Sequence, residues 1–351
     1  MVKRAFLGKF QDLNVFDRMI TEIGIPNQIN QVSRGLLSGQ LRVLNLGPLQ
    51  LLHVDFNQAM VIRGSKPPNR FLFAMTMAQK GGMLKTHGRD TPQDYLYGSS
   101  PYYNMHLLTP PQFKFAVVSV DQGYFRQFLK QIGQEALGDR LQHENWQQID
   151  ADRYNPLKAY VREIFQAMVR CPQFLDDQGQ GVGGVSPHQL ITENLLPLLA
   201  ACLTSNEVRL KAFEAKDNRL LLVKQAESLI EENLDKPITL TDLYQSLHTS
   251  RRTLIYAFND VVGMSPIAYI KVLRLNAIRR CLLVGHPQIT SVFQIARQYG
   301  FWSHGHFSRD YRTLFGESPS QTLRGTDRSC HWHPPTDLKE GGRSRKIALF
   351  E

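Results

Sequence analysis

The stretch that decides the fold of the C-terminal part is Ser250-Arg-Arg-Thr-Leu-Ile-Tyr-Ala-Phe-Asn-Asp-Val-Val-Gly-Met-Ser-Pro266. A second copy follows fifty-three residues later and matches it at four identical positions, which pair Ser250 with Ser303, Gly263 with Gly316, Ser265 with Ser318 and Pro266 with Pro319. The apolar positions coincide as well: Leu254 with Phe307, and Phe258 with Tyr311. Agreement of both the apolar positions and the Gly-x-Ser-Pro ending indicates an internal duplication.

The first copy predicts two helices joined by a short turn. Thr239 or Thr241 is expected to cap a helix that runs through Leu247, because a threonine hydroxyl can accept a hydrogen bond from the first helical turn. Ser250 is expected to cap the next helix, which ends at Gly263, since glycine readily takes the left-handed conformation of a helix end. Two short helices around a turn form a helix-turn-helix.

The second copy repeats this pattern. Residues 289–299 are expected to form its first helix, Gly300 the turn, Ser303 the cap of the second helix, and Gly316 its end. Residues 266–283, between the copies, lack helix breakers after the initial proline and predict a rod of roughly 27 Å at about 1.5 Å per residue. Such a rod could hold two helices about one DNA turn apart, roughly 34 Å.

Positive charge is concentrated in this duplicated segment. The whole chain has 41 basic and 31 acidic residues, a formal net charge of +10, which favours an anionic partner without identifying it. Between residues 250 and 280 one acid, Asp260, stands against six basic residues: Arg251, Arg252, Lys271, Arg274, Arg279 and Arg280. A solvated helix face would give a similar pattern, but charge and duplication together favour DNA.

The N-terminal part has a different pattern of apolar and turn residues. From about residue 34 to residue 120, short apolar runs alternate with Gly and Pro turn signals, which predicts an antiparallel sandwich or barrel. After Asp121 the apolar spacing becomes helical, with one helix expected over residues 156–170. Another is expected to start at Ser186-Pro187, and Pro197 should kink it.

The chain is therefore predicted to be α+β. An N-terminal mostly β region covers residues 1–121, and a helical region for dimerisation or linkage covers residues 122–215. A double helix-turn-helix domain follows over residues 216–324, with the boundary near residues 206–216, and residues 325–351 form a mobile tail.

Composition sets further bounds. The length of 351 residues is typical of about two domains, and 42% hydrophobic with 21% charged residues excludes a mainly disordered chain. The longest apolar run, residues 195–203, is far short of the roughly 20 residues of a membrane span, and no secretory signal is evident at the N-terminus. With few cysteines and no C-x-x-C pair, we expect a cytoplasmic protein without a membrane partner.

The duplicated segments resemble the AraC/XylS family of bacterial transcription regulators over about residues 220–324. The resemblance is carried by the stretch 250–266, by residues 269–277, and by Ile295-Ala-Arg-Gln-Tyr-Gly-Phe with Phe307-Ser-Arg-Asp-Tyr-Arg-Thr-Leu-Phe-Gly-Glu-Ser-Pro. Two shorter segments, Leu247-His-Thr-Ser-Arg-Arg-Thr-Leu and Gly300-Phe-Trp-Ser-His-Gly-His-Phe-Ser, are similar to regulators of ethanolamine utilisation operons.

The resemblance implies an effector-responsive regulator, usually an activator. Residues 1–215 would then form a cupin-like β-barrel followed by helices, and would bind an effector or dimerise. The partners implied are promoter DNA, RNA polymerase and a second copy of the chain. The effector is unknown, and no cofactor or metal site is predicted.

The first turn of each recognition helix enters the major groove in this motif, so the exposed residues there are the candidate readers. In the first unit, Arg252 suits bidentate contact with guanine and Ile255 a thymine methyl, while position alone puts Arg251 and Tyr256 nearer phosphates. Family members make base contacts at positions matching Arg252, Ile255, Tyr256, His304, Gly305 and Arg309, although Gly305 has no side chain. The residues predicted for base readout are Arg252, Ile255, Tyr256, His304, His306 and Arg309. The residues predicted for phosphate contact are Ser250, Arg251, Lys271, Arg274, Ser303, Ser308 and Arg312.

Other interpretations remain open. The N-terminal domain could act on a small molecule as an enzyme or metal-binding cupin, or the chain could be an architectural DNA binder without sequence preference. Gly179-Gln-Gly-Val-Gly-Gly184 fits G-x-G-x-x-G, but no strand precedes it, so we expect a loop. His304-Gly-His306 and Cys330-His-Trp-His333 lack zinc-finger spacing. No spacing supports a catalytic triad.

Overall fold

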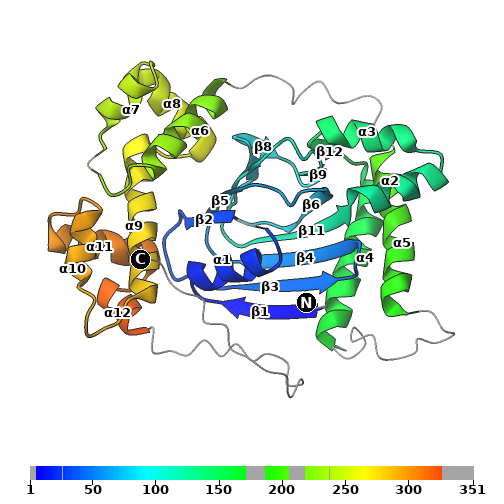
Figure 1. The fold of residues 1–351 in the computed structure, drawn as a ribbon, viewed down its shortest axis with the longest axis horizontal. Helices are drawn as coiled ribbons and strands as arrows, with labels where there is room; N and C mark the ends of the chain where they lie inside the picture. The colour runs from blue at the N-terminus through cyan, green and yellow to red at the C-terminus, as the bar shows by residue number, and fades with distance from the viewer. Residues whose placement is uncertain (1–4, 26, 171–185, 205–217, 237, 326–351) are drawn as a thin grey trace, which may run out of the picture.

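The fold was analysed in a computed structural model, which describes residues 5–25, 27–170, 186–204, 218–236 and 238–325. A β-sheet domain lies between two groups of helices (Figure 1). On one side stand α4 (Ala151–Arg170) and α5 (Pro187–Leu203), and on the other lie the C-terminal helices along α9 (Pro266–Val284). The predicted α+β class is confirmed.

Two antiparallel sheets make up the β domain in the described residues. The larger sheet has the strand order β1-β3-β4-β11-β6-β9-β12. Its strands are β1 (Ala5–Phe10), β3 (Gly39–Asn45), β4 (Leu49–Phe56), β11 (Phe113–Asp121), β6 (Arg70–Ala78), β9 (Tyr95–Tyr97) and β12 (Trp146–Gln148). The smaller sheet has the order β2-β5-β10-β7-β8. Its strands are β2 (Asn27–Gln31), β5 (Met60–Gly64), β10 (Met105–Leu108), β7 (Leu84–Thr86) and β8 (Arg89–Thr91).

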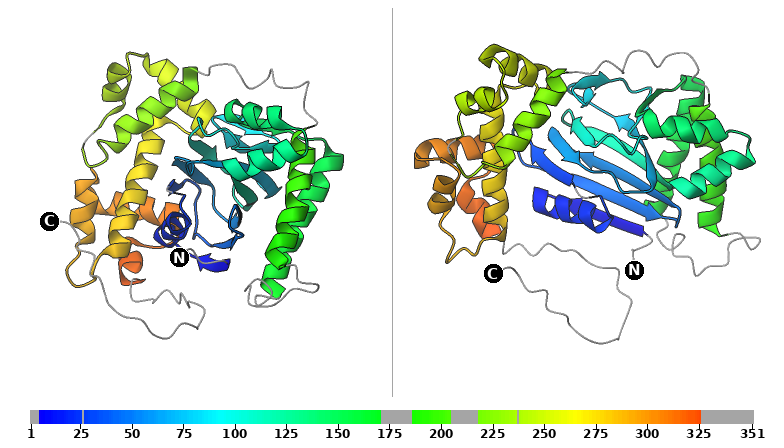
Figure 2. Two further views of the ribbon diagram at one scale, coloured as in Figure 1. Left: turned by 45° about the vertical axis from the view of Figure 1, so that its right-hand side comes forward. Right: turned by 45° about the horizontal axis from the view of Figure 1, so that its top comes forward.

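The larger sheet buries both of its faces. On one face Phe71, Phe73 and Val118 pack in a common core with apolar residues of α4 and α5. On the other face Val54 and Phe113 pack with residues of the smaller sheet and of α1 (Leu13–Glu22). The two views of Figure 2 show α4 and α5 standing apart from the C-terminal helices, across the sheets.

The helical segment between the sheets and the C-terminal domain differs in detail from the sequence prediction. Two short helices, α2 (Gln122–Gln131) and α3 (Glu135–His143), precede α4. The helix expected from residue 156 begins at Ala151 instead. Pro156 forfeits one intrahelical bond, but Tyr154 and Leu157 are both buried, and this packing outweighs the loss. The predicted start of α5 is confirmed, since Ser186 accepts a hydrogen bond from the Gln189 N–H, and the helix continues through Pro197.

Seven helices follow in the C-terminal part that the structure describes. They are α6 (Asn218–Glu231), α7 (Leu240–Ser246), α8 (Arg251–Val262), α9, α10 (Val292–Gln298), α11 (His304–Phe315) and α12 (Pro319–Arg324). The expected domain boundary near residues 206–216, the loop at residues 179–184, and the tail with Cys330 and His333 lie outside the described residues. No single described helix is both long and apolar enough to cross a membrane; α8 and α9 meet that test only together, and are bent by 56° at their junction.

Candidate nucleic-acid interface

The first helix-turn-helix unit consists of α7 and α8. Thr239, rather than Thr241, caps α7, and its hydroxyl and backbone N–H pair with the backbone N–H and carboxylate of Asp242 in a capping box. His248 turns the chain with a φ of 48°, and the Ser250 hydroxyl then accepts the Thr253 N–H at 3.0 Å. Gly263 ends α8 at a φ of 74°. The predicted caps and end of this unit are therefore confirmed.

The second unit consists of α10 and α11. Its first helix begins at Val292, capped by Ser291, and not at Ile289 as predicted. The reason is a preceding turn, closed by a 2.8 Å bond from Thr290 N–H to the His286 carbonyl, which leaves the Ile289 side chain 84% exposed. Gly300 supplies the expected turn at a φ of 82°.

The two recognition helices are α8 and α11, and each buries the predicted face. Leu254 and Phe258 are fully buried in α8, as are Phe307 and Tyr311 in α11. The copies differ at their caps. Ser303 occupies the position equivalent to Ser250 but makes no capping hydrogen bond. Its hydroxyl is therefore available to another acceptor or donor.

The first turn of α8 carries a preorganised pair. The Arg252 guanidinium lies over the Tyr256 ring, 5.3 Å from its centroid, and its Nη2 donates to the Tyr256 hydroxyl at 3.3 Å. Arg251, Arg252 and Tyr256 are exposed, and Ile255 is half-buried. The candidate readers thus form one surface on the side of α8 away from its core.

The first turn of α11 is equally open. His304, Gly305, His306 and Arg309 are exposed, and Ser308 is half-buried. The His304 ring contacts Phe293 of α10, with 5.9 Å between centroids. The structure therefore brings the predicted readers of each unit together on its recognition helix.

An aromatic side chain that the sequence analysis did not single out lies beside this second set. Trp302, directly before Ser303, is 70% exposed, and the Arg297 guanidinium lies 5.4 Å from its ring centroid. Arg297 also lies 5.8 Å from the Phe293 ring. Trp302 could have been found from the sequence, because it is an aromatic residue directly before a recognition helix and is not one of the repeated apolar positions.

The basic residues predicted for phosphate contact divide into two groups. Arg251 and Arg312 are exposed. Lys271 instead pairs with Asp310 at 2.5 Å, and Arg274 donates to the carbonyls of Leu234 and Lys236 at 3.3 and 2.6 Å. Each of the last two cations is thus already engaged within the domain, and a phosphate contact there would use the N–H donors that these bonds leave over.

The other two arginines of α9 have acidic partners. Arg279 is 4% exposed and pairs with Glu317 at 2.8 Å, so it holds α9 against the second unit. Arg280 pairs with Asp17 of α1 at 3.6 Å. Neither side chain is free to approach DNA in this arrangement.

The β domain contains a mainly apolar cavity between its two sheets. The larger sheet contributes Leu52, Val54 and Val117, and the smaller sheet contributes Ile29, Ile62 and Leu107. The lining also includes the polar side chains of Lys66, His87 and Asn145. The Lys66 ammonium donates to the Asn145 side-chain oxygen at 2.7 Å, and burial lowers the pKa of Lys66 to about 7. Burial also lowers the pKa of His87, to about 2, so that its ring is neutral.

The described residues contain no group of three or more His, Cys, Asp or Glu side chains arranged to hold a metal ion.

Comparison with known proteins shows what the C-terminal part is similar to. Residues 243–325 match the model of a helix-turn-helix domain. A stretch of 95 residues, 27% of this chain and 30% of the relative, is 41% identical to the XylDLEGF operon transcriptional activator of Pseudomonas putida. The C-terminal domain is of the AraC/XylS type that is found in transcription regulators. The AraC/XylS domain is the DNA-binding part of the chain.

Two further relatives share this AraC/XylS domain. The chain is 30% identical over 157 residues, 41% of its length and 47% of the relative's, to a probable thc operon regulatory protein of Rhodococcus erythropolis. It is 38% identical to the solved structure of a probable AraC family regulator from Rhodopseudomonas palustris CGA009, covering 30% of this chain and 97% of that one, with a TM-score of 0.28. The chain thus spans less than half of the length of the Rhodococcus erythropolis and Pseudomonas putida relatives.

Proposed function

We propose that this protein is a sequence-specific transcription regulator that reads two successive major grooves with α8 and α11. The observation that carries the proposal is the duplicated helix-turn-helix, whose two recognition helices both expose their first turns at the two ends of one connecting helix, α9. Exposed guanidinium, imidazole and hydroxyl groups there suit base edges and phosphates. The named activators among the relatives favour activation over repression.

The proposed readers are those of the sequence analysis: Arg252, Ile255, Tyr256, His304, His306 and Arg309. The residues proposed to contact phosphates are Ser250, Arg251, Lys271, Arg274, Ser303, Ser308 and Arg312. To this set we add Trp302. Its exposed ring adjoins the first turn of α11, where Gly305 leaves a reading position without a side chain.

Footprinting on a genomic fragment library at about 0.15 M salt tests the proposal. We expect discrete protection over about two major grooves per chain. Specific sites normally bind roughly 10³-fold or more tighter than other DNA, so equal protection of all sequences would reject sequence-specific reading. That result would leave an architectural DNA binder.

The β domain is proposed to bind a small effector in its apolar cavity. A mainly apolar lining with a few polar groups is the usual composition of a small-molecule site. Binding would shift the protein between states that differ in DNA binding or in contact with RNA polymerase. We expect an effector to alter the footprint or transcription in a reconstituted system.

Three further features belong to this proposal. A second copy of the chain and RNA polymerase are the expected protein partners, and the cytoplasm is the expected compartment, where bacterial promoters lie.

Residues 247–254 and 300–308 are similar to regulators of ethanolamine utilisation operons. An ethanolamine operon is therefore the proposed target. Footprinting of the control region of such an operon, with and without ethanolamine, tests this; protection elsewhere only would reject it.

A further inference from the structure

The cavity and the DNA-binding domain lie on opposite faces of the same strands. Side chains alternate between the two faces of a strand. In the antiparallel register of β2, β5 and β10, Ile29 pairs with Ile62 and Ile62 with Leu107. All three line the cavity. The rows on either side of them must therefore point away from it.

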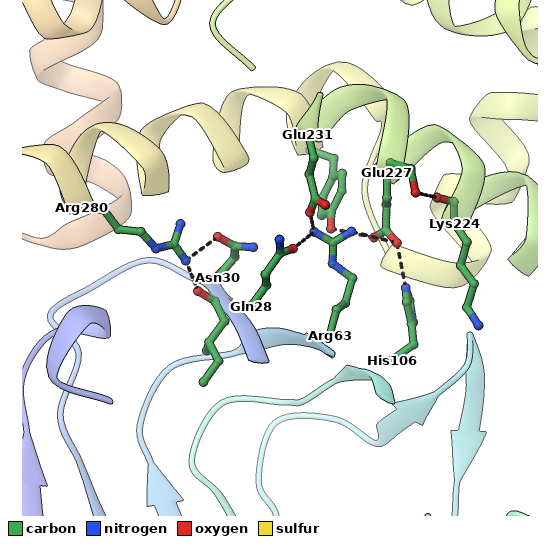
Figure 3. Close-up of polar contacts among 11 residues, drawn as sticks. Gln28, Asn30, Arg63, His106, Lys224, Glu227, Glu231 and Arg280 are labelled. Atoms are coloured by element: carbon green, nitrogen blue, oxygen red, sulfur yellow. Dashed lines mark hydrogen bonds and ion pairs between the residues drawn. The ribbon is translucent and has the colours of Figure 1, made fainter. Parts of the chain in front are cut away.

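Both of those outward rows contact the C-terminal domain. One consists of Gln28, Arg63 and His106, which are register partners. Figure 3 shows all three directed towards the side chains of α6. In the other row, Val61 and Leu108 join the apolar core of the first helix-turn-helix unit with residues of α6, α8 and α9. The sheet is thus the single layer between the cavity and that unit.

Glu227 of α6 is the centre of this contact. Its carboxylate accepts from His106 Nε2 at 3.1 Å, lies 3.2 Å from Arg63 Nη1, and accepts from the Tyr269 hydroxyl of α9 at 2.7 Å (Figure 3). Burial alone would raise the pKa of Glu227, but His106, Arg63 and Tyr269 outweigh burial and hold the pKa below its usual value. Arg63 also pairs with Glu231. A buried carboxylate with this many partners fixes geometry, because losing any one partner leaves charge uncompensated.

The connecting helix α9 is held by β2, the edge strand of the smaller sheet. The Asn276 amide donates to the Gln31 carbonyl at 3.0 Å and its oxygen accepts the Gln31 N–H at 3.1 Å, so the side chain continues the ladder of β2. Arg280 donates to the carbonyl of Ile29, one of the cavity residues.

We propose that β2, β5 and β10 form a transmission sheet, through which the contents of the cavity set the position of the first helix-turn-helix unit. Glu227 is its positioning residue for DNA recognition. This inference rests on the proposed function, since it takes α8 and α11 as the reading helices and the cavity as the effector site.

The expected direction follows from where the β domain holds these helices. Lys85 Nζ donates to the Asp260 carbonyl near the end of α8, at 2.7 Å, and the Gly35 N–H donates to the Leu314 carbonyl near the end of α11, at 3.0 Å. The first turns of both helices stay exposed. The β domain therefore supports the reading helices from their C-terminal ends, and loosening it should weaken specific DNA binding.

A first experiment measures DNA affinity of the full chain. Glu227→Gln keeps the shape of the side chain but removes its charge, and we expect about tenfold weaker binding to the footprinted site, within the usual range of coupling between sites. The salt dependence should not change, because no phosphate contact is removed. Tyr269→Phe, which removes one of the bonds to Glu227, should have a smaller effect. Glu232→Gln, at an exposed position just after α6, is the control; tighter or unchanged binding by Glu227→Gln would overturn the proposal.

A second experiment needs no DNA, so it separates this inference from the proposed function. Leu107→Ala and Leu52→Ala remove the same atoms from the two opposite walls of the cavity. Hydrogen exchange of the full chain should be faster in residues 218–231 for Leu107→Ala only. Equal effects of the two variants on that helix, or no effect of either, would overturn the transmission role. If an alanine variant does not fold, the matched Leu→Val pair gives the same comparison.

Discussion

At the scale of single residues, the copies of the duplicated motif present different chemistry to DNA. The first recognition helix offers a stacked guanidinium and phenol, Arg252 on Tyr256. The second offers imidazoles and a glycine at its first turn, with Trp302 alongside. The two half-sites should accordingly differ in sequence, with a fixed guanine preference expected mainly from Arg252.

Replacing Arg252 tests base reading. Arg252→Ala should cost about 1–3 kcal/mol of binding free energy at the specific site and relax the base preference at one position. Arg251→Ala is the matched control, because it should weaken all sequences alike and reduce the salt slope. Binding selections on randomised duplexes measure both effects. An unchanged base profile for Arg252→Ala would contradict the assignment.

Replacing Trp302 tests the added contact. Trp302→Ala should weaken DNA binding without changing the salt slope, since the indole carries no charge, and Trp302→Phe should retain part of the affinity. Tyr102→Ala serves as control, because Tyr102 is 73% exposed on the β domain, far along the chain from the recognition helices. Equal titration curves for Trp302→Ala and the unmodified chain would exclude Trp302 from the interface.

His53 gives the β domain a defined sensitivity to acid. Burial, followed by the charges of Arg42 and Lys114, lowers its pKa from 6.5 to about 4. In the unfolded chain this histidine binds a proton below about pH 6.5, whereas in the fold it stays neutral until about pH 4. Its contribution to stability is therefore present above pH 6.5 and is lost as the pH falls towards 4. Urea unfolding at about pH 7 and pH 5 should show a smaller acid loss for His53→Gln; an identical loss would refute this.

At the scale of elements, periodicity and turn residues made much of the fold predictable. The caps at Ser186 and Ser250, the glycine ends at Gly263 and Gly316, and the long strands punctuated by Gly and Pro follow from local sequence. The strands of three or four residues were not predicted, because such short segments carry too few periods to be distinguished from loops. The predicted strand pattern began only near residue 34, so β1, α1 and β2 were missed as well, although Leu13, Phe16 and Ile20 of α1 have helical spacing and are buried. The starts of α4 and α10 were misplaced where packing, or a preceding turn, decided the first residue.

The two glycine helix ends provide a matched pair. Gly263 and Gly316 have φ values of 74° and 75°. A Cβ on Gly263 would meet nothing within 4 Å, but on Gly316 it would lie 2.9 Å from the Leu36 nitrogen. Gly263→Ala should therefore cost only the left-handed strain of about 1–2 kcal/mol of unfolding free energy, and Gly316→Ala distinctly more. Chemical denaturation measures both; equal costs would mean that Leu36 moves aside freely.

At the scale of the whole molecule, the sequence predicted the parts but not their contact. Glu227 and Arg63 are 164 positions apart, and Asn276 and Gln31 are 245 positions apart. In its local sequence, each of these four residues is an ordinary polar residue of a helix or strand. Burial of a polar side chain against a distant partner leaves no period in the sequence, so neither the transmission sheet nor the role of Glu227 could be foreseen.

The Asn276 contact predicts how the domains unfold together. Asn276→Leu should remove both bonds to Gln31 and leave a buried backbone N–H and carbonyl unpaired, at a cost of about 1–3 kcal/mol per unsatisfied group. We expect thermal unfolding to separate into two transitions as the domains lose their coupling. Asn259→Leu, on the exposed side of α8, is the control. One sharp, unshifted transition for Asn276→Leu would contradict the expectation.

The ladder that Asn276 completes also limits how the molecule can move. β2 is an edge strand of the smaller sheet, and α9 covers that edge with the Asn276 amide and the Arg280 guanidinium. If the domains swung fully apart, the edge would offer unpaired N–H and carbonyl groups beside the apolar side chains of Val61 and Leu108. Such an edge recruits strands from other molecules and leads to aggregation. The proposed regulation is therefore expected to use small displacements of a domain that stays docked, because a wide opening would expose this edge and favour aggregation.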